Sequence, residues 1–175
     1  MKKLQLLLVF AVLLVGSSTL LAQTVVKAEL SGGNEAPEKI ISAATADVTY
    51  NVYSDRVEFT VRLRQFGTDV NQIHVHIAPE GLSGPIILNM YNRAIHGAIP
   101  GVETIEGGVF YGVSTVDDVT PRLTNDLRVR GVRNFADVVA ALLNPAALTY
   151  TNIHTTSVAG GEIRGQNRLA IEPIR

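Results

Sequence analysis

Three of the four histidines in the chain fall in two short runs where they alternate with β-branched residues. His74 and His76 lie in segment 72–77, and His154 lies in segment 152–155. Successive side chains of a strand point to opposite faces, so His74 and His76 share one face. If the two runs are neighbours in a sheet, three imidazoles converge on one patch. Imidazole suits copper, zinc and nickel, so this pattern predicts a mononuclear metal site with an open fourth position.

Two further residues extend this hypothesis. His96 becomes a fourth ligand if segment 92–108, rich in glycine and proline, folds back onto the two runs. Arg164 could steer a negatively charged substrate toward the metal, because a guanidinium beside a concave site attracts anions. A simpler interpretation is also open, in which the histidines occupy the polar face of a strand and hydrogen-bond to neighbours such as Tyr150, Asn152 or Glu162.

Other kinds of chemistry find little support in the sequence. Glu162 and Arg164 lie two residues apart on one strand face, and an ion pair is the simplest interpretation of both. The chain contains no cysteine, which excludes disulfides, thiolate metal sites and thiol catalysis. No Ser-His-Asp pattern, phosphate-binding loop or dinucleotide fingerprint is present.

The first 22 residues predict export. Met1-Lys2-Lys3 is followed by an apolar run and then by small and polar residues up to Ala22, the layout of a secretory signal peptide. The rival interpretation is an uncleaved N-terminal anchor. Cleavage would leave 153 residues, enough for one domain, with a formal charge of about −3. We therefore expect a secreted or periplasmic protein that binds neither nucleic acid nor, after cleavage, a membrane.

Short alternating segments separated by glycine, proline, asparagine and aspartate dominate the rest of the chain. Their pattern predicts an all-β fold, an antiparallel Greek-key β-sandwich or barrel, over residues 24–168, with residues 169–175 as a tail. The expected strands cover about 24–30, 44–52, 56–64, 72–78, 85–91, 109–114, 127–130, 148–156 and 162–166. One short helix is expected at about 135–143, because Asn134 suits an N-cap, Asp137 suits the first turn and Asn144-Pro145 ends it.

Several motifs follow one another along the chain: the opening 28–37, His74-Val75-His76-Ile77-Ala78-Pro79 with Gly81 and Gly84-Pro85, Asn152-Ile153-His154-Thr155, and 160–166. In this order they resemble the CHRD domain, the module named after chordin, over about residues 24–168. The resemblance implies an exported β-rich module without a settled reaction. Segment 92–108 departs from the family by its length.

A looser similarity connects the chain with copper–zinc superoxide dismutases. Those enzymes also have a His-x-His strand, a later lone histidine, and a glycine-rich turn leading to an arginine beside the metal. Here these would be His74 and His76, His154, and Gly160-Gly161 leading to Arg164. The chain lacks the cysteine pair and an obvious zinc loop, so the similarity implies a copper-only or degenerate site.

Three functions are therefore open. The first is an exported CHRD-type binding module that holds a transition metal, copper or zinc, through clustered histidines. The second is a copper-dependent oxidoreductase similar to superoxide dismutase, with Arg164 steering the anion. The third is a structural cell-surface or matrix protein that contacts another extracellular protein or a surface polymer. Metal dependence separates the first two from the third, and turnover separates the first from the second.

Overall fold

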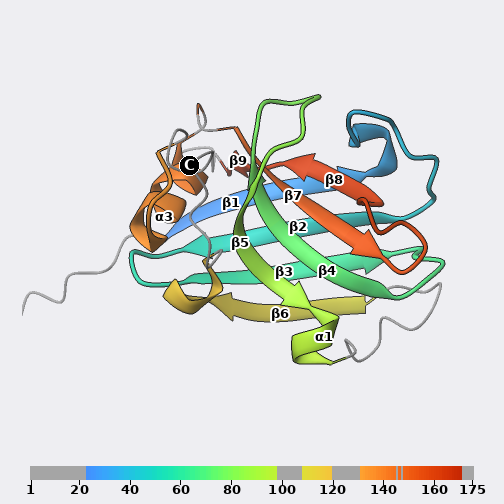
Figure 1. The fold of residues 1–175 in the computed structure, drawn as a ribbon. Helices are drawn as coiled ribbons and strands as arrows, with labels where there is room; N and C mark the ends of the chain where they lie inside the picture. Colours follow the sequence, from blue (N-terminus) through green and yellow to red (C-terminus); the bar gives the residue numbers. More distant parts are fainter. Residues whose placement is uncertain (1–22, 98–107, 120–130, 145, 147, 171–175) are drawn as a thin grey trace, which may run out of the picture.

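The computed structural model describes residues 23–97, 108–119, 131–144, 146 and 148–170, and its described part is an antiparallel β structure (Figure 1). The strands are β1 (Thr24–Ser31), β2 (Thr45–Val52), β3 (Val57–Arg64), β4 (Val70–Ile77), β5 (Ile86–Asn92), β6 (Gly108–Ser114), β7 (Thr149–Thr155), β8 (Ile163–Gln166) and β9 (Arg168–Leu169). Among the described residues the helices are α1 (Arg93–His96) and α3 (Phe135–Leu143), and the 3-10 turns include η1 (Gly32–Asn34) and η2 (Val116–Asp118). No helix in these ranges is long and apolar enough to cross a membrane.

The strands form one sheet that curls into a nearly closed barrel. Their order is β5-β4-β7-β8-β1-β2-β3-β6, and β9 pairs with β1. Strands β1, β2 and β3 follow one another as a meander, whereas the chain crosses the barrel between β3 and β4 and again between β6 and β7. These crossings place β7, which is late in the sequence, directly beside β4. The predicted all-β antiparallel class is confirmed.

The alternation of apolar and polar residues in the sequence places the apolar side chains inside this barrel and the polar side chains outside it. In β3, the side chains of Val57, Phe59, Val61 and Leu63 are buried, and the residues between them are half-buried or exposed. The paired strand β2 buries Ala46, Val48, Tyr50 and Val52 in the same way. Full burial of such an apolar side chain contributes about 1.5–3 kcal/mol, so the alternation fixes the register of both strands.

Helix α3 begins and ends where the sequence predicts. The Asn134 side chain accepts a hydrogen bond from the Asp137 backbone N–H at 3.0 Å, as an N-cap does, and Asn144 ends the helix. Its apolar face is buried, led by Phe135, Val138 and Leu142, and the helix contacts β1 and β2. It covers one end of the barrel (Figure 1).

Several expectations fall partly or wholly outside the described residues. These are the signal peptide at 1–22, the strand at 127–130, part of segment 92–108 and the end of the tail. The described part of 92–108 begins with the single turn α1, which the sequence pattern did not indicate. Sheet pairing continues beyond residue 168, because Leu169 pairs with Val26 and the Ala170 N–H donates to the Val25 carbonyl.

Candidate metal centre

The two histidine runs lie on adjacent strands. β4 pairs with β7 in a register that sets His74 opposite Asn152 and His76 opposite Tyr150. Ile73 and Ile153 pair on the other face and are fully buried in the barrel core. The histidines therefore lie on the outer face of β4, and His154 lies diagonally across from His74. The two histidine runs are therefore neighbours in the sheet, as the predicted metal site requires.

The three imidazoles of His74, His76 and His154 form a compact group, which we call the histidine cluster. One ligand nitrogen from each ring can be chosen so that all three lie within 4.8 Å of one another. The ring centroids of His74 and His154 are 5.1 Å apart, those of His74 and His76 are 5.7 Å apart, and those of His76 and His154 are 6.4 Å apart. Ions bound by imidazole need nitrogens about 2.0–2.1 Å from the metal, so three nitrogens at this spacing can share one ion after small rotations.

Backbone carbonyls fix the orientation of two rings. His76 Nδ1 lies 2.9 Å from the Gly84 carbonyl oxygen, and His154 Nδ1 lies 2.9 Å from the Ala159 carbonyl oxygen. A carbonyl can only accept, so Nδ1 donates in both rings and Nε2 keeps its lone pair. This arrangement, with the second ring nitrogen held by a backbone oxygen, is the usual support of a metal-binding histidine.

Three buried nitrogens of the histidine cluster have no hydrogen-bond partner. They are His74 Nδ1, His76 Nε2 and His154 Nε2. Buried polar atoms are nearly always hydrogen-bonded, and leaving one without a partner costs about 1–3 kcal/mol. Three such atoms in one group, one from each ring, therefore need an explanation that a satisfied polar strand face does not give.

Burial keeps the cluster uncharged. Desolvation, followed by the charges of His154 and His76, lowers the pKa of His74 to about 3. Desolvation also lowers the pKa of His76 to about 4, against the opposing hydrogen bond to Gly84, and it lowers the pKa of His154. Neutral rings at pH 7 have lone pairs free for a metal ion.

An aromatic ring and a buried arginine form one wall of the cluster. The His76 ring stacks on Tyr150, with centroids 4.8 Å apart and an angle of 8° between the planes. The Arg164 guanidinium lies 4.7 Å from the centroid of the Tyr150 ring. Arg164 is only 2% exposed and donates to the carbonyls of Asn34 at 2.6 Å and Leu82 at 2.9 Å. It thereby ties η1 and the loop after β4 to β8.

A buried carboxylate and a buried amide lie near this wall of Tyr150 and Arg164. Asn152 donates through Nδ2 to Glu35, at 3.2 Å to the nearer carboxylate oxygen. Burial raises the pKa of Glu35, and the neighbouring charge of Arg164 opposes that rise. Gly161 has φ of +121°, and a Cβ there would lie 2.7 Å from Asn152 Oδ1. Only glycine fits both the backbone conformation and this space.

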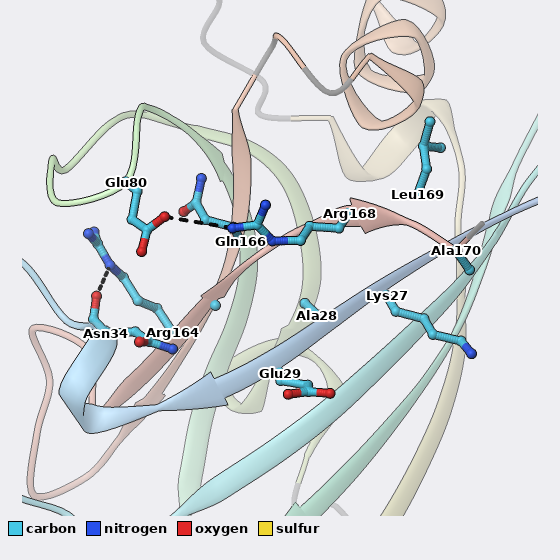
Figure 2. A pocket seen from close by; sticks show the side chains of 11 residues that line it. Lys27, Ala28, Glu29, Asn34, Glu80, Arg164, Gln166, Arg168, Leu169 and Ala170 are labelled. Atoms are coloured by element: carbon cyan, nitrogen blue, oxygen red, sulfur yellow. Dashed lines mark hydrogen bonds and ion pairs between the residues drawn. The ribbon is translucent and has the colours of Figure 1, made fainter.

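A surface cavity lies beside Arg164, and its lining does not include the histidines. Its volume is about 440 Å³, and Figure 2 shows the residues that line it on the outer side of β1, β8 and β9. Arg164 lines the cavity and reaches Asn34, while the Glu80 carboxylate lies 3.7 Å from Arg168 across its rim. The exposed charges on its lining are of both signs. The cavity and the histidine cluster thus have no residue in common, although Arg164 lines the cavity and contacts Tyr150 beside the cluster.

The other sequence-predicted residues lie apart from the cluster or act differently. His96 ends α1, is exposed, stacks against Tyr91 at 5.9 Å and accepts a hydrogen bond from the Asn92 N–H. It does not belong to the group of three. Arg164 is close to the cluster, and its guanidinium donates hydrogen bonds to the carbonyls of Asn34 and Leu82. Its role in steering an anion stays a prediction.

The predicted ion pair between Glu162 and Arg164 is wrong. Glu162 instead accepts hydrogen bonds from Ser42 Oγ at 2.6 Å and Thr155 Oγ1 at 2.5 Å. Glu162 lies just before β8 and is buried, so its carboxylate needs partners from the protein, and the two hydroxyl groups supply them. The Arg164 guanidinium donates to backbone carbonyls instead. The carbonyls of Gly84 and Ala159 were missed as partners of the histidines, because backbone acceptors leave no signal in residue types.

The fold and the cluster together define an antiparallel β-barrel domain with a buried group of neutral imidazoles on one outer face. A comparison with protein families agrees with the motifs that carry the resemblance. The family described as the CHRD domain matches residues 26–167, so the chain belongs to the CHRD family. No curated protein and no solved structure matches the chain.

Proposed function

We propose that this protein is an exported CHRD-type binding module that holds one transition metal ion, copper or zinc, in the histidine cluster. The ligands are His74 Nδ1, His76 Nε2 and His154 Nε2. Two observations carry the proposal together. Each of the three rings keeps one buried nitrogen without a hydrogen-bond partner, and one ligand nitrogen from each ring can be chosen so that all three lie within 4.8 Å of one another.

A bound metal ion accounts for features that a purely structural role leaves unexplained. The structural alternative needs hydrogen bonds for the buried rings, yet each ring keeps one nitrogen without any. A cation at their centre would use all three lone pairs at once. The carbonyls that hold His76 and His154 orient them for this purpose before any ion binds, which lowers the entropy cost of binding.

Binding fits the cluster better than turnover. A superoxide dismutase-like oxidoreductase, the second candidate, needs a cation that draws anions in from solvent, and Arg164 is nearly inaccessible to solvent. The proposed compartment is secreted or periplasmic, supported by the signal-like residues 1–22. There the module would meet metal ions outside the cytoplasm, and any partner protein or surface polymer would contact its exposed faces.

Elemental analysis of the mature protein, purified without a histidine tag and then titrated with copper and zinc, tests the proposal. We expect one ion per chain in the wild type and none in His76→Ala. His96→Ala is the matched control, because it removes the one histidine outside the cluster, and it should keep its metal.

A second set of variants tests whether the ligands act as one site. His74→Ala, His154→Ala and the double variant should lose the ion to the same extent, because a three-ligand site fails when any ligand is lost. Additive or absent effects would contradict a shared site. Superoxide turnover by the copper-loaded protein would favour the oxidoreductase, and no metal at micromolar concentration would favour a structural interaction module.

A further inference from the structure

We propose that the buried charge of Arg164 makes the histidine cluster selective for copper in its monovalent state over divalent copper or zinc. This inference rests on the proposed function, because it concerns the same three ligands. It adds a specificity-determining residue that does not touch the ion. The proposed function names copper or zinc, and this inference narrows the ion to monovalent copper.

The ligand set brings no negative charge to the ion. All three ligands are neutral imidazoles, and no carboxylate belongs to the group. The two buried carboxylates nearby are engaged elsewhere: Glu35 accepts from Asn152, and Glu162 accepts from Ser42 and Thr155. An ion in the cluster therefore keeps its full formal charge in a site where His74 is 3% exposed and His76 is 8% exposed.

Burying that charge penalises divalent ions. The cost of moving an ion from water into a medium of low dielectric grows with the square of its charge, so a divalent ion loses about four times as much as a monovalent ion of the same size. Among monovalent ions, alkali metals prefer oxygen ligands, whereas copper takes imidazole nitrogen. Copper(I) is thus the monovalent ion that suits these ligands.

Arg164 strengthens the penalty. Its guanidinium has no ion pair with a carboxylate among the described residues, and its Nη2 atom is buried without a hydrogen-bond partner. It lies close to His76, because the Tyr150 ring contacts both side chains. Repulsion between this fixed positive charge and a bound ion is twice as large for a divalent ion.

Arg164 has a structural role as well as a charge. Arg164 also holds η1 and the loop after β4, as Figure 2 shows for Asn34. Its substitution can therefore change both geometry and charge, and the test must separate the two.

The measurement is the dissociation constant for zinc(II) divided by that for copper(I), both determined on the same protein. A high ratio means selectivity for copper(I). Copper(I) is presented without oxygen through a chromophoric copper(I) chelator, and zinc(II) through a zinc indicator. Loss of geometry weakens both ions together and leaves the ratio unchanged, whereas loss of charge changes the ratio. We expect wild-type protein to bind copper(I) at least about a hundredfold more tightly than zinc(II).

Four variants locate the effect. Arg164→Gln should lower the ratio about tenfold or more, and Arg164→Lys, which keeps the charge, should lower it much less. Glu35→Gln removes the charge of a buried carboxylate that accepts from Asn152, the residue paired with His74, and should raise the ratio. Arg62→Gln removes an exposed arginine on β3 and should leave the ratio unchanged. If Arg164→Gln does not fold, the wild-type ratio and Glu35→Gln still decide.

The outcomes separate this inference from the proposed function. Zinc(II) bound as tightly as copper(I) by the wild type, or an equal ratio in the wild type and Arg164→Gln, overturns the selectivity and leaves the metal site standing. A ratio that does not rise in Glu35→Gln also counts against it. If the wild type retains neither ion, the proposed function fails, and the selectivity fails with it.

Discussion

Two parts of the outer barrel surface differ in what covers them. On β3 and β6 the outward side chains are open to solvent, as Arg62 is, and Tyr111 is 68% exposed. On β4, β7 and β8 the outward side chains are polar too, yet loop carbonyls contact several of them. There His74 is 3% exposed and Arg164 is 2% exposed. A polar residue in solvent has water as its partner, whereas a covered one needs a partner from the protein or a ligand. The covered face lacks some of those partners, and this difference points to the metal site.

The largest effect on the covered face should come from Gly84→Ala. A Cβ at Gly84 would lie 2.1 Å from the Ile77 carbonyl oxygen, so the loop that orients His76 must move. We expect a loss of about 3 kcal/mol in the free energy of unfolding and at least about a tenfold loss of metal affinity. Denaturant unfolding and metal titration measure the two effects.

Gly67→Ala is the control for that change. Nothing lies within 4 Å of a Cβ at Gly67, so the free energy of unfolding should change by less than about 0.5 kcal/mol. An equally small effect in Gly84→Ala would show that the loop over the covered face is free to relax.

Acid should weaken the covered face of the metal-free protein. The pKa of His74 is about 3 in the folded chain, against about 6.5 when unfolded, so the unfolded chain binds a proton first as the pH falls. Stability contributed by neutral His74 is complete above pH 6.5 and is lost as the pH falls toward 3. His76, with a pKa of about 4, adds to this loss in the same direction, and Arg164 is the fixed charge that faces it.

The measurement is the free energy of unfolding at pH 7 and pH 4. We expect His74 to account for a loss on the order of 2–3 kcal/mol between these values. His74→Gln should reduce the pH dependence by that amount, and His96→Gln, on exposed α1, should not change it. A wild-type pH dependence in His74→Gln would contradict the burial of a neutral ring.

The contrast between these surfaces also marks what the sequence alone could predict. Alternation of apolar and polar residues predicts the ends of β2, β3 and β4 to within about two residues, because every second side chain of these strands is buried in the barrel core. The same alternation places His74 and His76 on one face. It says nothing of whether that face is wet, since loops that cover a strand follow no comparable period.

The pairing of β4 with β7 lies at the limit of such reasoning. Similar residues in both runs suggest that they are neighbours, but His154 lies 78 positions after His76 and 80 after His74, and the barrel crossings bring them together. The ion pair expected for Glu162 failed for a related reason. Its side chain accepts from Ser42, which lies 120 residues away along the chain, as well as from Thr155, which lies seven residues away.

Core and surface valines give a smaller and more conventional contrast. Val61 is fully buried in β3, whereas Val113 on β6 is 56% exposed. Val61→Ala should lower the free energy of unfolding by about 2 kcal/mol, because it removes buried methyl groups and leaves a cavity. Val113→Ala should cost less than about 0.5 kcal/mol in the same denaturant titration. Equal costs would mean that β6 is covered in solution by a partner that contacts its outer face.

The smallest effect should come from a charged pair on the open face. Arg64 and Asp47 form an ion pair at 2.5 Å between neighbouring strands, and both side chains are close to half exposed. Water screens such a pair, so Asp47→Asn should cost no more than about 0.5 kcal/mol, and less at high salt. Arg164 carries the same charge under cover, where screening is weak, and its substitution should change metal selectivity at any salt concentration. A salt-dependent selectivity would place Arg164 in solvent and remove the distinction between the two faces.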